Sequence, residues 1–243
     1  MSIHDAPERP VALVTGAGSG IGRAVAVALA ASGHDLALVG RRADALETTI
    51  EAARAGAPDA ALIAVPADLA QPHAPASVVA TTVEHFGRLH AIVNNAGYAA
   101  LADVADTTID TLETSFSINS FAPALLVAAA WPVFVRQGHG RVINISSMAT
   151  FDPFPGFFVY AAAKAALESM TRSIQSEGRR HGIRAWSIAP GAVETAMLRG
   201  LFPASALPAS KTLAPDTIAA VVVDCLLGRR DDAAGTVIPM PNP

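Results

Sequence analysis

The sequence predicts an α/β protein with one doubly wound parallel sheet of about seven strands, helices on both faces, and a single domain. Short apolar runs rich in β-branched residues alternate with longer Ala-rich helical patterns along the 243 residues. This alternation is typical of a parallel sheet whose strands are buried on both sides. A hydrophobic content of 51% provides the apolar surface that one sizeable core requires.

Each expected strand is a short apolar run that ends at glycine, proline or polar residues. Longer helical patterns fill most of the intervals between the runs, which favours parallel strands joined by helices. The seven runs are residues 11–15, 36–40, 61–65, 91–94, 141–146, 183–189 and 236–239.

Two segments fall outside this alternation. Residues 1–10 are polar and contain proline but no apolar signal region, so we expect a flexible N-terminal tail before a domain of residues 11–243. Residues 190–215 form the one long irregular stretch and carry Pro203, Pro208 and Pro215 among apolar residues. A stretch of this length is often a substrate lid, and a surface loop without a ligand role is the alternative.

Composition and charge favour a small-molecule partner over nucleic acid or a membrane. The net charge is −4 and the 17 lysines and arginines form no cluster, so no positive field is available for a polyanion. The longest apolar stretch, residues 121–135, contains two prolines and falls short of a bilayer span, which favours a buried helix. Cys225 is the only cysteine and the histidines are scattered. We therefore expect no disulfide, no metal and a cytoplasmic location.

A glycine-rich turn follows the first expected strand. The run from Thr15 to Gly22 reads Thr-Gly-Ala-Gly-Ser-Gly-Ile-Gly and opens a helix expected over residues 23–31. Small residues let backbone amides approach a pyrophosphate, and the helix N-terminus adds a partial positive charge. The turn therefore predicts a dinucleotide site, although a purely structural turn is the alternative. The candidate binding residues are Gly16, Ser19, Gly20, Ile21 and Gly22.

Tyr160 and Lys164 stand four residues apart on an expected helix, so one turn places a phenol and an ammonium on the same face. A phenol has a pKa near ~10 and exchanges protons poorly at neutral pH unless a nearby cation favours the phenolate. We expect Lys164 to lower the pKa of Tyr160 and so make it an acid or base. A solvated helix face with a packed aromatic residue is the alternative.

These motifs follow one another in an order that resembles the classical short-chain dehydrogenase/reductase family, and the resemblance covers nearly the whole chain. It implies a Rossmann-like fold and hydride transfer between a nicotinamide cofactor and a carbonyl or alcohol substrate. The matching residues are Gly16, Gly20 and Gly22 in the turn, Asn94, Asn95, Ala96 and Gly97 after the fourth strand, Ser147 at the end of the fifth, and Tyr160 with Lys164.

By this resemblance, Ser147 hydrogen-bonds the carbonyl oxygen of the substrate and Tyr160 protonates it. Lys164 lowers the pKa of Tyr160 and holds the nicotinamide ribose, and Asn119 anchors a water-mediated proton relay to the lysine. Asn119 could instead be an ordinary buried hydrogen-bonding group. Ser146 competes with Ser147, but strand alternation turns Ser146 to the other face, and the spacing of Ser147 to Tyr160 matches the family.

The end of the second expected strand bears on the choice of cofactor. Nicotinamide-binding folds place an acidic residue there to bind the ribose hydroxyls of NAD, but this chain has Gly40, followed by Arg41 and Arg42. A guanidinium group can hold a phosphate with two parallel hydrogen bonds. We therefore predict NADP(H), with NAD(H) second and two ordinary solvated arginines as the alternative. Ser19 adds no second positive group, so selectivity could be incomplete.

The remaining cofactor contacts implied by the resemblance lie at three strand exits and reach the adenine, the adenosine and the nicotinamide amide in turn. Each has a structural alternative, because Asp, Pro and Gly are common where strands end. The residues are Asp68 and Leu69 after the third strand, Asn95, Ala96 and Gly97 after the fourth, and Pro190, Gly191, Val193 and Thr195 after the sixth.

Apolar side chains gather near the expected reacting centre and in the expected lid, which favours a ketone or secondary alcohol with apolar substituents. For the phenylalanines near the centre an oligomer surface is an equal alternative. The resemblance implies a homodimer or homotetramer that pairs helices near residues 114–137 and 160–180, although the tail 235–243 lacks the Asp-Gly-Gly ending common in relatives. The apolar residues are Phe151, Phe154, Phe157, Phe158, Met197, Leu198, Leu201 and Phe202.

The sequence therefore predicts an NADP(H)-preferring oxidoreductase of the short-chain dehydrogenase/reductase type. A catalytically silent NADP(H)-binding sensor is the alternative from a different class of function. A sensor has no need of the full reacting set, whereas Asn119, Ser147, Tyr160 and Lys164 are all present.

Overall fold

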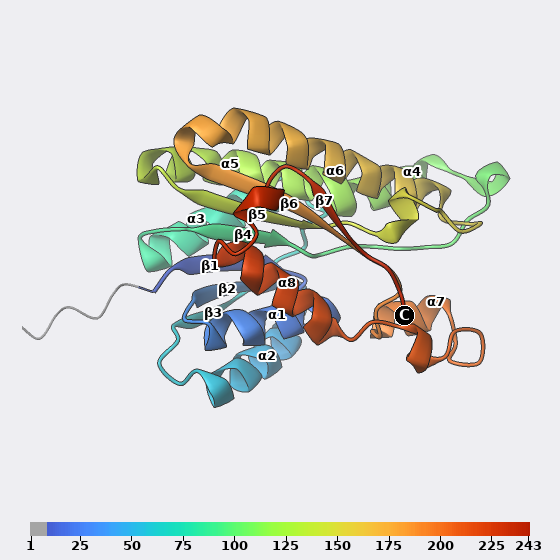
Figure 1. Cartoon of the computed structure of the whole chain (residues 1–243), viewed down its shortest axis with the longest axis horizontal. Helices are drawn as coiled ribbons and strands as arrows, with labels where there is room; N and C mark the ends of the chain where they lie inside the picture. Colours follow the sequence, from blue (N-terminus) through green and yellow to red (C-terminus); the bar gives the residue numbers. More distant parts are fainter. Residues whose placement is uncertain (1–8) are drawn as a thin grey trace, which may run out of the picture.

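The computed structural model describes residues 9–243 and contains one parallel sheet of seven strands between two layers of helices (Figure 1). The strand order is β3-β2-β1-β4-β5-β6-β7, so the order reverses between β1 and β4. This topology confirms the predicted doubly wound α/β fold. The strands are β1 Val11–Thr15, β2 Asp35–Gly40, β3 Leu62–Pro66, β4 Ala91–Asn94, β5 Gly140–Ile145, β6 Ile183–Pro190 and β7 Val237–Met240.

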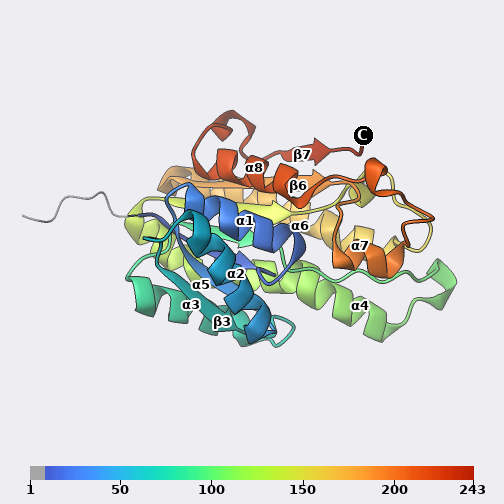
Figure 2. The same ribbon diagram turned by 90° about the horizontal axis from the view of Figure 1, so that it is seen from below.

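The helices divide between the two faces of the sheet (Figures 1 and 2). Their bounds are α1 Gly20–Ala31, α2 Ala43–Gly56, α3 Ala74–Phe86, α4 Ile109–Phe116, α5 Ala122–Gln137, α6 Phe158–Gly178, α7 Ala196–Leu201 and α8 Pro215–Leu226. On one face α1 packs against α2 and α8, and on the other α5 packs against α3 and α6.

The central strands are buried on both sides because these two layers cover them. Along β1, Ala12 and Val14 pack into the cluster under α1 and α8, whereas Val11 and Leu13 pack into the cluster under α3 and α5. All four side chains are fully buried. Continuous apolar runs in the sequence follow from this double burial. The packed sheet holds the carboxyl ends of its strands at fixed positions along one edge.

Strand and helix ends differ slightly from the prediction. Each strand begins and ends within one residue of the expected position, and β5 ends at Ile145, which leaves Ser146 and Ser147 beyond the strand. The first helix begins at Gly20 rather than at residue 23, so the last glycines of the turn already belong to α1. Propensity alone places the helix start later because glycine is a poor helix former.

The segment of residues 190–215, which we call the lid segment, is less irregular than expected. It contains α7, whose N-cap residue Thr195 accepts a hydrogen bond from the backbone N of Leu198 at 3.2 Å. A 3₁₀ turn follows at Ala209–Lys211. The cap supplies the local stabilisation that lets a short helix form between prolines.

The apolar stretch at residues 121–135 is buried on one side only, which corrects the expectation of a buried helix. The helix α4, the π-helical turn Ser117–Phe121 and α5 form one continuous helix, Ile109–Gln137, and half of its most apolar part is buried. Phe121 is 55% and Leu125 is 42% exposed. Among residues 9–243 this is the one helix long and apolar enough to cross a membrane, a property that core helices of soluble proteins share.

The expected flexible tail at residues 1–10 falls mainly on residues 1–8, which lie outside the described residues. Arg9, by contrast, is tied to the domain. Its Nε lies 3.2 Å from Oδ1 of Asp35, and its Nη2 donates to the carbonyl oxygen of Ala30 at 3.0 Å. Arg9, which precedes the first strand, is therefore part of the packed domain.

Candidate active site

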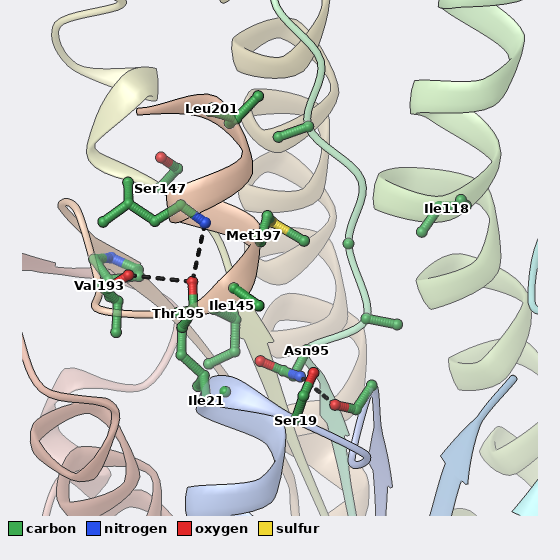
Figure 3. Close-up of a pocket in the computed structure, with 18 of the residues that line it drawn as sticks. Ser19, Ile21, Asn95, Ile118, Ile145, Ser147, Val193, Thr195, Met197 and Leu201 are labelled. Carbon is green, nitrogen blue, oxygen red and sulfur yellow. Dashed lines mark hydrogen bonds between the residues drawn. The ribbon is translucent and has the colours of Figure 1, made fainter. Parts of the chain in front are cut away.

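The carboxyl ends of β1, β4, β5 and β6 open into one cleft of about 940 Å³. Ligands of doubly wound proteins bind at this edge, where the strand order reverses. Figure 3 shows Ser19 at one end of the cleft and Ser147 with Leu201 at the other. Every residue predicted for catalysis or cofactor binding lines the cleft except Gly22 and Asn119.

The two ends of the cleft differ in composition. We call the end lined by Gly16, residues 18–21, Arg41, Arg42 and Asp68 the glycine end. The end lined by Phe154, Phe157 and residues of the lid segment is the aromatic end. Within residues 9–243, no group of three or more His, Cys, Asp and Glu side chains is placed to hold a metal ion at either end or elsewhere.

At the glycine end, the turn leaves backbone amides available at the start of α1. Gly16 and Gly20 have φ angles of 65° and 52°, a region that favours glycine. Ser19 precedes α1 in an extended conformation, and its side chain makes no capping hydrogen bond. The first N–H groups of α1, together with the helix dipole, therefore suit an anion such as a pyrophosphate. Gly22 lies behind the turn, where a Cβ would overlap the carbonyl oxygen of Gly16, so it serves packing.

Thr15 fastens the end of β1 to the end of β4, a role that the sequence analysis missed. Its Oγ1 accepts hydrogen bonds from the backbone N of Asn95 and of Ala96, each at 2.9 Å, and donates to the carbonyl oxygen of Val93 at 3.2 Å. Asn95 returns a bond from Nδ2 to the Thr15 carbonyl oxygen at 2.9 Å. Asn95 and Ala96 thus form a firm wall of the cleft at the point where the strand order reverses.

Tyr160, Ser147 and Lys164 meet between the two ends of the cleft. The Ser147 side chain lies near enough to Tyr160 to lower the pKa of its phenol, and its Oγ accepts a hydrogen bond from the backbone N of Ala149 at 3.1 Å. Lys164 is 3% exposed, and its Nζ donates to the carbonyl oxygen of Ile145 at the end of β5, at 2.7 Å. The structure therefore brings three of the four predicted catalytic residues together.

The pKa of Tyr160 differs from the sequence-based expectation. Burial raises the pKa of Tyr160, and the nearby Ser147 side chain opposes this shift. Burial also lowers the pKa of Lys164 to about 8. The expected lowering by Lys164 is not the dominant effect, and its ammonium donates to the Ile145 carbonyl oxygen and lies 5.9 Å from the centre of the phenol ring. Spacing along a helix predicts proximity but not the desolvation that opposes the charge effect.

Ser146 points away from Tyr160, as the prediction in favour of Ser147 requires. Ser146 is 2% exposed and its Oγ donates to Oε1 of Glu168 at 2.6 Å. The same carboxylate oxygen accepts from Oγ1 of Thr150 at 2.9 Å. Glu168, one turn after Lys164 on α6, therefore links the helix that carries the reacting phenol to the loop that carries Ser147. The sequence analysis did not single out Glu168.

Asn119 lies behind the cleft wall rather than in it. It is fully buried in the π-helical turn, where its side chain accepts from the backbone N of Tyr98 at 3.1 Å and donates to the carbonyl oxygen of Tyr98 at 2.8 Å. A Cβ on Gly97 would lie 3.1 Å from Oδ1 of Asn119 and 3.6 Å from Nζ of Lys164. Gly97 is thus in contact range of both residues, and the predicted relay role of Asn119 stays a prediction.

Arg41 and Arg42 stand at the far side of the glycine end, directly after Gly40. Both side chains are exposed and line the cleft, and within residues 9–243 neither guanidinium group has a hydrogen-bonding or ionic partner. Asp68 is also exposed there, with Oδ1 accepting from the backbone N of Ala70 at 3.1 Å. The strand exit that would carry an acidic residue in an NAD site therefore presents two cations instead.

At the aromatic end, Phe157 joins the wall to the reacting phenol. Its ring centre lies 5.3 Å from that of Tyr160, 6.2 Å from that of Phe202 and 6.3 Å from that of Phe154. The predicted phenylalanine group divides, because two members are about half exposed and do not line the cleft. These two are Phe151 and Phe158.

Arg199 holds the lid segment together, which the sequence analysis also missed. Its Nε donates to Oε1 of Glu194 at 2.6 Å, and its Nη2 pairs with the other carboxylate oxygen. Its Nη1 donates to the carbonyl oxygens of Leu207 at 2.7 Å and Phe202 at 3.3 Å. The hydrogen bond from Arg199 lowers the pKa of the Glu194 carboxyl. One side chain thus connects three parts of the segment that closes the aromatic end.

Fold and cleft together define a nucleotide-binding oxidoreductase of the doubly wound class, and comparison with known proteins identifies its family. The chain matches the short chain dehydrogenase family over residues 10–206 and therefore belongs to it. It is 32% identical to an uncharacterized oxidoreductase of Staphylococcus epidermidis, over 78% of this chain and 80% of that protein. An uncharacterized oxidoreductase of Staphylococcus aureus is 31% identical over 89% of this chain and 90% of its own length.

Solved structures of the same fold agree over nearly the whole chain. A levodione reductase superposes with a TM-score of 0.89 at 31% identity and covers 96% of both chains. A xylitol dehydrogenase bound to NAD⁺ superposes with a TM-score of 0.85 at 25% identity, over 95% of this chain and 96% of its own. The protein is thus an oxidoreductase of a family that binds nicotinamide dinucleotides.

Proposed function

We propose that the protein transfers a hydride between NADP(H) and a ketone or secondary alcohol with apolar substituents, with Tyr160 as acid or base. The observation that carries this proposal is that Tyr160, Ser147 and Lys164 line the cleft together at the junction of its two ends. The glycine end presents backbone amides and arginines, and the aromatic end presents apolar side chains. A polar reacting pair between them suits a carbonyl group held beside a dinucleotide.

A nicotinamide dinucleotide fits the residues of this cleft. The left-handed glycines and the uncapped start of α1 suit its pyrophosphate, and the unpaired arginines suit a ribose phosphate. When bound, the dinucleotide supplies or accepts the hydride, and the protein supplies position and a proton. The residues that would hold it are Gly16, Ser19, Gly20, Ile21, Arg41, Arg42, Asp68, Leu69, Asn95, Ala96, Gly97, Tyr160, Lys164, Pro190, Gly191, Val193 and Thr195.

The hydroxyls of Tyr160 and Ser147 are the two groups that act on the carbonyl oxygen. Negative charge builds on that oxygen during reduction, so two positioned donors stabilise the transition state more than the ground state. The raised pKa of Tyr160 keeps the phenol protonated at neutral pH, which suits it to donate a proton in the reductive direction. Lys164, held at the end of β5, is the residue we assign to the nicotinamide ribose.

Preference for NADP(H) is supported by the strand exit after β2. Gly40 leaves no carboxylate there to repel a phosphate, and the guanidinium groups of Arg41 and Arg42 have no other partner within residues 9–243. The related xylitol dehydrogenase was solved with NAD⁺, so family membership alone does not decide between the dinucleotides.

The aromatic end supports an uncharged substrate, because every charged residue that lines the cleft lies at the glycine end or at the junction. We also propose a cytoplasmic homodimer or homotetramer. The exposed side of the continuous helix, with Phe121 and Leu125, offers apolar surface for a second copy, as does Phe158 on α6.

Binding and turnover test the proposal separately. Titration with NADPH and NADH tests the cofactor preference, and tighter binding of NADH would contradict it. Turnover over a panel of neutral ketones and secondary alcohols is then compared between the wild type and Tyr160→Phe. The variant keeps the ring on Phe157 but loses the hydroxyl, so kcat should fall ~10²–10⁴-fold while NADPH binding is retained.

Full activity of Tyr160→Phe would overturn the assignment of Tyr160. A wild-type protein that binds NADPH and turns over no member of the panel would favour the sensor alternative.

A further inference from the structure

The segment after β7 reaches the strand exit to which we assign the nicotinamide amide. β7 pairs in parallel with β6 as far as Pro190 and Met240, and the pairing continues where the backbone N of Gly191 donates to the Met240 carbonyl oxygen at 2.9 Å. Beyond that point the hydrogen bonds to the chain after β6 come from a side chain rather than from the backbone. Oδ1 of Asn242 accepts from the backbone N of Ala192 at 2.9 Å, and its Nδ2 donates to the Ala192 carbonyl oxygen at 2.8 Å. The Asn242 carboxamide therefore acts as one more peptide group of the ladder.

Two neighbouring residues, Leu213 and Gly191, support the contact between Asn242 and Ala192. The Ala192 carbonyl oxygen also accepts from the backbone N of Leu213 at 2.8 Å, so the lid segment and Asn242 hold the same peptide from two directions. A Cβ on Gly191 would overlap Oδ1 of Asn242, and Gly191 is not among the glycines with positive φ. Glycine is therefore needed at position 191 for the approach of Asn242 rather than for backbone freedom.

The residues just beyond Ala192 line the cleft. Val193 is 6% exposed and bridges to Leu213, and the Oγ1 of Thr195 donates to the Val193 carbonyl oxygen at 3.2 Å (Figure 3). On its other side Thr195 lies against the glycine-rich turn, because a Cβ on Gly20 would lie 2.9 Å from Cγ2 of Thr195. The position of residues 193–195 relative to the turn thus depends on where Ala192 is held.

We propose that Asn242 is a positioning residue for the nicotinamide end of the cofactor, acting through Ala192 on the backbone of Val193 and Thr195. This inference rests on the proposed function, because it concerns the cofactor proposed there. An asparagine suits the task because it offers one acceptor and one donor side by side, as a peptide does. Asn242 also lines the cleft, so the segment beyond β7 forms part of its wall.

Two variants and one control separate this role from a general effect on the tail. Asn242→Ala removes both hydrogen bonds, whereas Asn242→Asp keeps an acceptor for the Ala192 N–H but sets a second acceptor against the Ala192 carbonyl oxygen. Pro243→Ala changes the neighbouring residue and leaves the carboxamide in place. Both positions, 242 and 243, are exposed to solvent, so the fold should tolerate each change.

The first measurement is amide hydrogen exchange without any ligand. The Ala192 amide should exchange at least ~5-fold faster in Asn242→Ala than in the wild type, because within residues 9–243 its one acceptor is the Asn242 side chain. Pro243→Ala should leave the rate unchanged. Equal Ala192 exchange in the wild type and Asn242→Ala would overturn the inference.

The second measurement is binding of NADPH and of adenosine 2′,5′-bisphosphate, which lacks the nicotinamide. Both Asn242 variants should bind NADPH roughly 5–10-fold more weakly and the bisphosphate as well as the wild type does. Equal NADPH binding, or equal weakening of both ligands, would overturn the inference while leaving the proposed function intact. A wild-type protein that binds the bisphosphate but gains nothing from the nicotinamide half, or binds neither ligand, would overturn the proposed function itself.

Discussion

The two ends of the cleft are built in different ways. The phosphate turn at the glycine end is backbone of one strand–turn–helix unit, with Gly22 packed behind Gly16 and Thr15 hydrogen-bonded to the residues after β4. The aromatic end is assembled from distant segments, and its form depends on side chains such as Arg199 and Phe157. At the glycine end the backbone is packed so closely that an added side-chain atom has no room, whereas at the aromatic end one side chain can be replaced without moving the backbone. Substitutions at the glycine end should therefore be poorly tolerated. Substitutions at the aromatic end should be tolerated by the fold and should change which substrate binds.

The largest expected effect comes from the same substitution made at each end. Gly22→Ala places a Cβ against the Gly16 carbonyl oxygen, so we expect a loss of about 3 kcal/mol in the free energy of unfolding and loss of dinucleotide binding. Gly200→Ala, in α7, meets nothing within 4 Å and should stabilise the protein by about 0.5–1 kcal/mol with binding unchanged. Urea unfolding and NADPH titration of both variants measure this difference. Comparable losses at the two glycines would contradict it.

The sequence predicts the glycine end well because its determinants are local. Buried parallel strands are continuous apolar runs, so all seven were located to within one residue, and the turn lies where a strand meets a helix. Tyr160 and Lys164 share a helix face, so their proximity also follows from spacing alone. The choice of Ser147 over Ser146 also follows from a local rule, the alternation of side chains at a strand end, and Ser146 is hydrogen-bonded to Glu168.

The parts that were missed depend on the tertiary structure. Asn242 meets Ala192 across 50 residues of sequence, and no local pattern indicates that contact. The direction of the Tyr160 pKa was wrong because burial, which opposes ionisation, is a property of the folded site. The π-helical turn in which Asn119 lies buried is likewise not encoded in a short motif.

A second prediction concerns Lys164, which lies where the two ends meet. Burial lowers its pKa from 10.5 to about 8. Between these values the folded protein binds fewer protons at this group than the unfolded chain does, so its contribution to stability rises with pH. From pH 7 to pH 9.5 the gain from this one group should be about 2 kcal/mol. The measurement is urea unfolding of the wild type and of Lys164→Met at both pH values.

The methionine variant lacks this titration but keeps the other groups, so the difference between the two proteins isolates Lys164. Any advantage of methionine at pH 7 should shrink by about 2 kcal/mol at pH 9.5. A difference that does not change with pH would mean that Lys164 is solvated in the folded protein, and that the junction is more open than its 3% exposure indicates.

The smallest expected effect tests whether the two ends are independent. Arg199→Ala removes the bonds that join Glu194 to Leu207 in the lid segment, so we expect the KM for an apolar ketone to rise ~3–10-fold, with kcat and NADPH affinity within about twofold of the wild type. Arg229→Ala is the matched control, because Arg229 pairs with Asp224 at 2.9 Å on an exposed surface away from the cleft. If Arg199→Ala weakened NADPH binding as much as ketone binding, the lid segment would contribute to ligand binding at both ends of the cleft. The two ends would then still differ in how they are built, one from backbone and the other from side chains, but they would not bind their ligands independently.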